Sequence, residues 1–175
     1  MTESDEIEKR AIISECGTYR YALSRFWDIR KRSFLIFIML NPSTADDKKD
    51  DPTIRRCINF TIRENRAGMA VLNLFALRAT DPKELKKHHA PVGPENNEYI
   101  NSAIREMREP VGKFVAAWGA HGTYKNRDYK VRQIFKEAGQ DLYCLGKTSK
   151  GHPKHPLYVP ADTPLEIYMK ANPHG

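Results

Sequence analysis

The sequence contains few cysteines, and they show no pairing pattern. Only three of its 175 residues are cysteine, Cys16, Cys57 and Cys144, and they lie far apart. The count is odd and no CxxC pair occurs, which disfavours a disulfide framework and a zinc or iron–sulfur site with four thiolates. We therefore expect free thiols in a reducing, cytoplasmic environment, with neither a metal nor a cofactor.

Long apolar runs are also missing. The longest strongly apolar run, residues 34–40, has seven residues, far too few to span a membrane. The first ten residues, MTESDEIEKR, are acidic and lack the apolar stretch of a signal peptide. Neither GxGxxG nor GxxxxGK[ST] occurs, so a dinucleotide enzyme or a P-loop NTPase is unsupported. We expect a cytoplasmic protein without a membrane partner.

Basic residues outnumber acidic ones. The chain has 29 Lys and Arg against 22 Asp and Glu, a formal net charge of +7, and four acids fall within its first eight residues. A basic body favours polyanionic partners such as nucleic acid or a nucleotide. A solvated lysine-rich surface explains the charge equally well.

Four apolar segments predict the strands of the core. They are residues 34–40, 69–75, 113–119 and 141–146. Their apolar residues are continuous rather than alternating, which is typical of parallel strands covered on both faces. Helical patterns fit between them. The sequence thus predicts an α/β fold, a three-layer sandwich with a central, mostly parallel four-stranded sheet.

The helices are marked by their first residues. Asp51-Pro52 is a good N-cap and first-turn pair for a helix that ends at Gly68. Pro94 opens a second helix, and residues 131–138 lie on a third.

The chain suits one domain at this length. Residues 17–28 alternate between apolar and polar side chains, which predicts an N-terminal edge strand or hairpin arm. We place the α/β domain at residues 13–160, between a flexible acidic N-terminus, residues 1–12, and a C-terminal tail, residues 161–175.

Polar groups lie at or just after the end of each of the four predicted strands. Ligands of open α/β sheets bind outside the carboxyl ends of the strands, so we expect these residues to converge. The set comprises Asn41 and Ser43, Asn73 and Arg78, Trp118 and His121, and the histidines His152 and His155.

Read in order, these strand ends resemble the motifs of the uracil-DNA glycosylase superfamily. VLNLFALRAT resembles the strand whose asparagine recognises the base, which implies that role for Asn73, and VAAWGAHG is similar to the strand that follows it. GHPKHPL resembles the His-Pro loop that enters the minor groove and supplies a catalytic histidine. LNPS resembles the Asn-Pro form of the first motif, in which asparagine positions water. The resemblance covers residues 35–157 and implies a uracil-DNA glycosylase-like fold.

The sequence is also similar to an uncharacterised family of bacterial and phage proteins, a domain of unknown function. The strings MLNPSTAD, NLFALRATDP and PVGPEN look like hallmarks of that family. This second resemblance implies no activity.

Two departures from the glycosylase pattern bear on the chemistry. Asn41 and Ser43-Thr44 stand where the first motif offers an aspartate and an aromatic residue, so a strong general base is missing there. Asp50 is the carboxylate positioned to replace it, although most such acidic runs are solvated loops. The His-Pro loop has an additional residue, which leaves both His152 and His155 as candidates.

Each candidate also has a purely structural interpretation. The Asn73 carboxamide offers a donor and an acceptor that match an imide or amide edge, or it caps a strand end. For Asn41, the functional interpretation is a contact with water or a sugar oxygen, and the structural one is the start of a turn. For His152, the functional interpretation is stabilisation of negative charge on the departing base, and the structural one is a solvated side chain in a stiff loop.

We therefore expect a nucleobase-recognising protein of uracil-DNA glycosylase-like type. It would hydrolyse an N-glycosidic bond in DNA or in a modified nucleotide, as in DNA repair or modification. The alternative is a non-catalytic nucleotide or nucleic-acid binding module of the same fold. The expected catalytic residues are Asn41, His152 and Asp50. The expected substrate-binding residues are Asn73, Ser43, Arg78, Trp118, His121 and His155. Contacts with the nucleic-acid backbone are expected from Lys147, Ser149 and Lys150.

Overall fold

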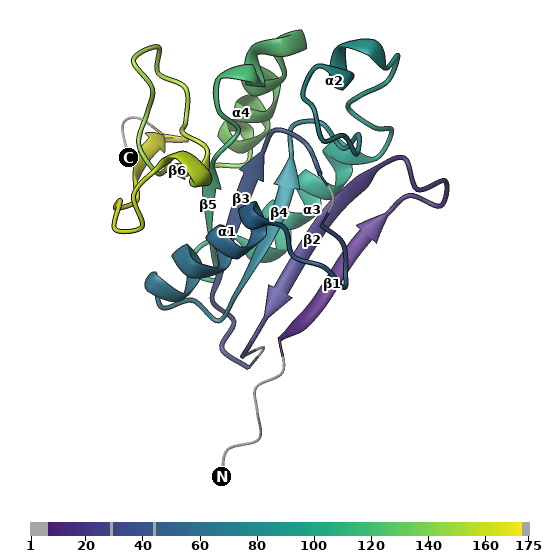
Figure 1. Cartoon of the computed structure of the whole chain (residues 1–175). Helices are drawn as coiled ribbons and strands as arrows, with labels where there is room; N and C mark the ends of the chain where they lie inside the picture. The colour runs from purple at the N-terminus through teal and green to yellow at the C-terminus, as the bar shows by residue number, and fades with distance from the viewer. Residues whose placement is uncertain (1–6, 29, 44, 173–175) are drawn as a thin grey trace.

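A seven-stranded mixed sheet forms the centre of the molecule (Figure 1). The computed structural model describes residues 7–28, 30–43 and 45–172. The strand order is β1-β2-β4-β3-β5-β6-β7. The strands are β1 (Glu8–Ile13), β2 (Arg20–Phe26), β3 (Phe34–Met39), β4 (Gly68–Asn73), β5 (Gly112–Ala116), β6 (Leu142–Cys144) and β7 (Glu166–Met169).

The four predicted core strands are present, and they are parallel. β4, β3, β5 and β6 are neighbours in that order, and each pair is parallel. The prediction of a four-stranded sheet was wrong, because antiparallel strands extend it on both sides. β1 and β2 join it beside β4, and β7 joins it beside β6. The hairpin arm expected in residues 17–28 is β2, but the edge of the sheet is β1.

Both ends of the sheet lie in segments that the sequence placed outside the domain. β1 falls largely within the acidic N-terminus, whose residues 1–6 lie outside the described residues, and β7 lies in the C-terminal tail. β1 is mostly exposed and β7 has four residues, so neither buries a long apolar run. A strand is recognised in a sequence by the apolar residues that it buries, and these two strands bury few.

Four helices complete the fold of the described residues. They are α1 (Pro52–Arg63), α2 (Glu84–Lys87), α3 (Asn96–Met107) and α4 (Arg127–Glu137), and two 3₁₀ helices, η1 (Ala120–Asn126) and η2 (Pro156–Tyr158), follow strand ends. Asp51 is the N-cap of α1, as predicted. The helix does not extend to Gly68, because Asn65 takes a left-handed conformation after Arg63 and Gly68 already belongs to β4. A side chain at Gly68 would lie 2.5 Å from the Phe26 ring.

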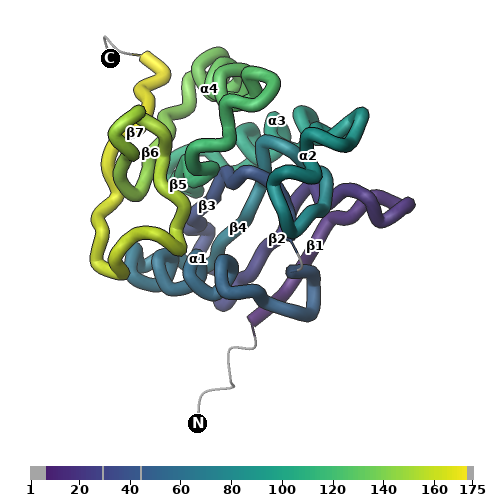
Figure 2. The backbone as a smooth tube through the Cα atoms, turned by 45° about the horizontal axis from the view of Figure 1, so that its top comes forward, coloured from purple at the N-terminus to yellow at the C-terminus, as the bar shows by residue number. Residues whose placement is uncertain are grey.

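The helices cover both faces of the sheet, which explains the continuous apolar pattern of its strands (Figures 1 and 2). Alternate residues of β3 face opposite layers. One core cluster joins Leu35, Phe37 and Met39 to Ile54, Cys57 and Phe60 of α1. The other joins Ile36 and Ile38 to Ile100 and Ile104 of α3 and to Val131 and Phe135 of α4.

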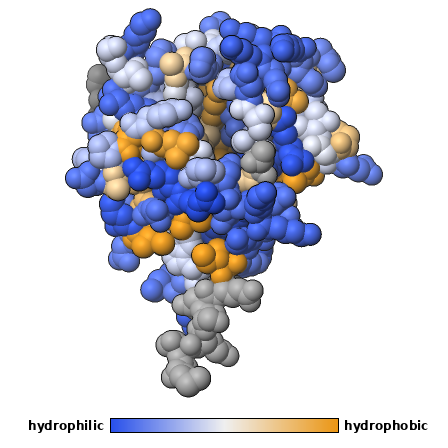
Figure 3. All heavy atoms as spheres, in the orientation of Figure 1, coloured by the Kyte–Doolittle hydropathy of each residue, from blue (hydrophilic) through white to orange (hydrophobic). Residues whose placement is uncertain are grey.

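The face shown in Figure 3 is largely polar: hydrophilic residues dominate it and the apolar residues form separate groups. Within the described part of the chain, no helix has the length and apolar character needed to cross a membrane.

Candidate functional site

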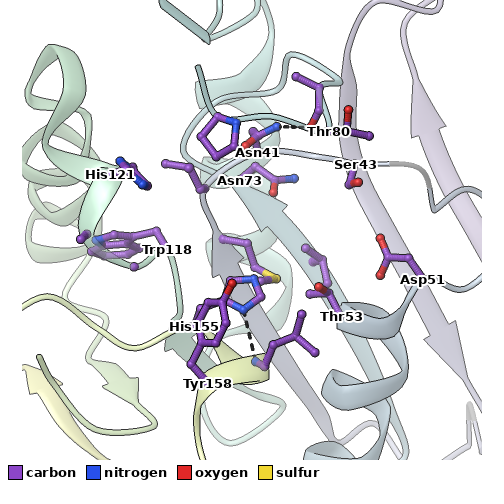
Figure 4. Close-up of a pocket in the computed structure, with 18 of the residues that line it drawn as sticks. Asn41, Ser43, Asp51, Thr53, Asn73, Thr80, Trp118, His121, His155 and Tyr158 are labelled. Atoms are coloured by element: carbon purple, nitrogen blue, oxygen red, sulfur yellow. Dashed lines mark hydrogen bonds between the residues drawn. The ribbon is translucent and has the colours of Figure 1, made fainter. Parts of the chain in front are cut away.

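A pocket of ≈ 630 Å³ lies at the carboxyl ends of the parallel strands. Separate parts of the chain line it: the start of β2, the loop from β3 into α1, the end of β4, the loop after β5 and the loop before η2. Its volume lies within the range of about 300–1,000 Å³ that is usual for small-molecule sites. The convergence of strand ends that we expected is therefore present (Figure 4).

Six of the residues expected from the sequence line this pocket. They are Asn41, Ser43, Asn73, Trp118, His121 and His155. Figure 4 shows His121 and Trp118 on one side, Asp51 and Thr53 on the other, and Asn73 between them.

Six others do not line it. Asp50 is held away by ion pairs with Arg25 at 2.7 Å and Lys9 at 3.3 Å. Arg78 donates to the Gly17 carbonyl at 3.1 Å in a neighbouring groove. The remaining four, Lys147, Ser149, Lys150 and His152, belong to the loop after β6 and do not reach the pocket. Thr44 lies outside the described residues.

Asn73 is the last residue of β4, and its side chain is buried without a partner. The residue is 1% exposed, and among the described residues neither Oδ1 nor Nδ2 has a hydrogen-bond partner. The amide of Asn96 on α3 instead holds the strand end, donating to the Asn73 carbonyl at 2.9 Å. Asn73 is thus no strand cap. Its carboxamide lines the pocket with a free donor and a free acceptor.

Asn41 has a partly structural role. Its Nδ2 donates to the carbonyls of Pro42 at 3.0 Å and Ala79 at 2.8 Å, which ties the end of β3 to the loop after β4. These bonds use both amide hydrogens, so Oδ1 is the atom left to accept a bond from a ligand or water.

His155, and not His152, is the histidine of the His-Pro loop that lines the pocket. Its Nδ1 accepts a hydrogen bond from the Leu157 amide at 3.2 Å, so the neutral ring carries its proton on Nε2. Burial lowers the pKa of His155, and the nearby Asp51 carboxylate opposes that shift. His155 therefore offers the pocket a neutral N–H donor.

Arg56 holds the turn that carries His155. Its Nε donates to the Pro156 carbonyl at 3.3 Å, and its Nη2 donates to the Val159 carbonyl. This side chain thus attaches η2 to α1.

Sequence reasoning did not assign Asp51 or Arg20 to the site, yet both line the pocket. Asp51 was explained by its role as the helix cap, which its Oδ1 fulfils for the Ile54 amide at 2.9 Å. Arg20 had no sequence signal, because it is the first residue of β2 and does not lie at the end of its strand.

Within residues 7–28, 30–43 and 45–172, no group of three His, Cys, Asp or Glu side chains is arranged to hold a metal ion.

The family of the chain is given by a match over most of its length. A family model described as a protein of unknown function (DUF1643) matches residues 20–157. No curated protein and no solved structure matches the chain. None of these comparisons links it to the uracil-DNA glycosylase superfamily. The matched residues run from β2 to η2 and include nearly the whole pocket lining, and the chain belongs to the DUF1643 family.

Proposed function

We propose that the protein recognises a nucleobase through Asn73 and hydrolyses its N-glycosidic bond, in DNA or in a modified nucleotide. The observation that carries this proposal is the buried, unpaired carboxamide of Asn73. A buried amide without partners costs free energy, and a ligand that supplies both an acceptor and a donor removes that cost. An imide or amide edge of a base has these two groups side by side.

His155 supports the hydrolytic part of the proposal. Negative charge develops on the base as the N-glycosidic bond breaks, and a fixed donor in a site that excludes water stabilises it. The neutral imidazole of His155, with Nδ1 bonded to Leu157, has such a donor in Nε2–H. In this proposal His155 takes the role for which His152 was an equal candidate.

Asp51 and Asn41 are proposed to handle the attacking water. Asp50 is engaged with Arg25 and Lys9, so Asp51 is the aspartate available in the pocket. A carboxylate within reach of water acts as a general base. Asn41 Oδ1 would orient the same water molecule.

A second candidate function is a non-catalytic nucleotide or nucleic-acid binding module. The Asp51 carboxylate already caps α1, and the Asn-Pro motif has no carboxylate of its own. A pocket that only binds would need Asn73 and would not need a base for water.

The test is a mass-spectrometric screen for released bases. The protein is incubated with DNA that contains uracil, hypoxanthine, alkylated or hypermodified bases, and with a panel of nucleotides. Release of one base class supports the hydrolase, whereas binding without release supports the module. Absence of both release and binding would overturn the proposed function.

A further inference from the structure

Arg20 is a buried cation without a carboxylate partner. It is 3% exposed, and among the described residues no carboxylate lies within 4.0 Å of it. Its Nη1 donates to the Ala45 carbonyl, and its buried Nε has no partner. Burying a cation in this way is costly unless something pairs with it.

The other two buried arginines are satisfied within the protein. Arg25 pairs with Asp50 at 2.7 Å. Arg127 donates to the Leu74 carbonyl at 2.6 Å and to Asn97 Oδ1 at 2.5 Å. Neither of them lines the pocket. Among these three arginines, the one that lines the pocket is thus the one with a buried guanidinium nitrogen that has no partner.

The backbone fixes Arg20 at the same edge of the sheet as Asn73. β2 runs antiparallel to β4, so its first residue meets the carboxyl end of β4, and Arg20 N donates to the Ala76 carbonyl at 2.9 Å. The guanidinium and the Asn73 carboxamide are therefore held by neighbouring strands of one rigid sheet.

The guanidinium remains charged near neutral pH. Burial lowers the pKa of Arg20 to about 10, which still lies well above neutrality. Asp51 and Asp46 favour its charge, while Arg78 and Arg25 oppose it. The residue is thus a persistent positive charge at the pocket wall.

We propose that Arg20 binds the terminal phosphate of a free nucleotide whose base Asn73 recognises. The base half of this statement rests on the proposed function, whereas the phosphate half rests on Arg20. A guanidinium presents a planar set of donors that matches phosphate oxygens. A phosphodiester inside a nucleic acid continues on both sides and needs an open path. A phosphate monoester ends the molecule and suits a group that is 3% exposed.

The experiment measures binding by isothermal titration calorimetry with matched pairs of probes. Ribose 5-phosphate is compared with ribose, and uridine and guanosine 5′-monophosphates are compared with their nucleosides. We expect each phosphorylated probe to bind at least tenfold more tightly than its partner. Arg20→Met should abolish this ratio, and Arg20→Lys should keep part of it, because lysine retains the charge but loses the planar donors. Arg78→Met, in the neighbouring groove, is the matched control and should leave the ratio unchanged.

Each outcome decides one half of the proposal. Equal binding of phosphate and non-phosphate probes would overturn the Arg20 site and leave base recognition standing. Ribose 5-phosphate binding that depends on Arg20, without preference among bases, would support the site and count against the role of Asn73. Tighter binding of an oligonucleotide that lacks terminal phosphates, with the same dependence on Arg20, would assign the site to nucleic acid and overturn the free-nucleotide proposal. If Arg20→Met fails to fold, Arg20→Lys decides: an unchanged ratio would then contradict the phosphate site.

Discussion

Asp51 accepts a hydrogen bond from the Ile54 amide at 2.9 Å, so the carboxylate that begins α1 also lines the pocket. One side chain thus combines a structural contact with a candidate chemical role. The two roles can be separated by substitution, because asparagine caps a helix about as well as aspartate but is no general base.

We predict that Asp51→Asn lowers the rate of base release at least a hundredfold and leaves the free energy of unfolding nearly unchanged. A general base contributes about 10²- to 10⁴-fold to a rate. Asp51→Ala should show the same loss of rate and also lose about 1 kcal/mol of stability, because the cap is gone. Rates are measured by mass spectrometry and stability by urea unfolding. Wild-type turnover in Asp51→Asn would exclude Asp51 as the base.

Asn73 gives a second prediction. Asn73→Ala should weaken binding or turnover roughly ten- to a hundredfold, since about 1–3 kcal/mol is lost when a buried polar edge of the ligand is left unpaired. Asn73→Asp should change which base is preferred, because a carboxylate only accepts hydrogen bonds.

The matched control for Asn73 is Asn96→Ala on α3. Asn96 is equally buried and bonds to the Asn73 carbonyl, so its loss should lower stability without changing base preference. If Asn73→Ala behaves like this control, Asn73 is a structural residue.

The third prediction concerns pH and His155. Burial holds the pKa of this histidine below its usual value of about 6.5. The unfolded chain therefore binds a proton more readily than the folded chain does. The contribution of His155 to the free energy of unfolding should be fully present above about pH 6.5. It should decline as the pH falls below that value and level off below the folded-state pKa of His155.

The measurement is the free energy of unfolding from pH 5 to 8. His155→Asn should flatten this slope, because asparagine can accept the Leu157 bond through Oδ1 without titrating. Identical slopes in the wild type and His155→Asn would show that His155 does not link folding to protonation.

The fourth prediction concerns Arg56, which fastens η2 to α1. Arg56→Ala should destabilise the fold by about 1.5–3 kcal/mol, the range for hydrogen bonds made by charged groups, and loosen His155. Arg55→Ala removes an exposed neighbour on the same helix and should cost less than about 0.5 kcal/mol. Equal effects in urea unfolding would mean that Arg56 does not secure the turn.

The fifth prediction distinguishes the three cysteines. Hydrogen bonds from Ser14 and Thr18 lower the pKa of the exposed Cys16 to about 7, whereas burial raises the pKa of Cys57 and raises that of Cys144 to about 11. The thiolate is the reactive form. Iodoacetamide should label one site per folded chain, with a rate that rises through about pH 7, and Cys16→Ser should remove it. Labelling of Cys57 or Cys144 without denaturant would contradict these assignments.

Strands and site residues differed in how well the sequence revealed them, and burial explains most of the difference. β3 is buried at all six of its positions, so its residues are apolar throughout and easily recognised. β1, at the edge, has mostly exposed residues and reads as a polar terminus. An outer strand is held by backbone hydrogen bonds to a single neighbouring strand, and these bonds do not depend on which side chains the strand carries.

The site was predictable where a residue ends or closely follows a buried parallel strand, as Asn73 and Asn41 do. Arg20 was not, because recognising it requires knowing that β2 runs antiparallel and brings its beginning to that edge. Asp50 and Asp51 are adjacent in sequence, and composition alone does not show which of the two faces the pocket. The path of the loop that carries His152 and His155 decides which of them lines the pocket, and composition does not determine this path.

The pocket is assembled from parts of the chain that are far apart in sequence, from Arg20 to Tyr158. It can therefore exist only when these parts have come together in the folded chain, and its ligand binds the folded state alone. Ligand affinity then adds directly to folding free energy, by about 2.7 kcal/mol at a ligand concentration one hundred times Kd. A melting-temperature screen of the native chain against nucleotides and sugar phosphates can thus find the ligand before any reaction is known.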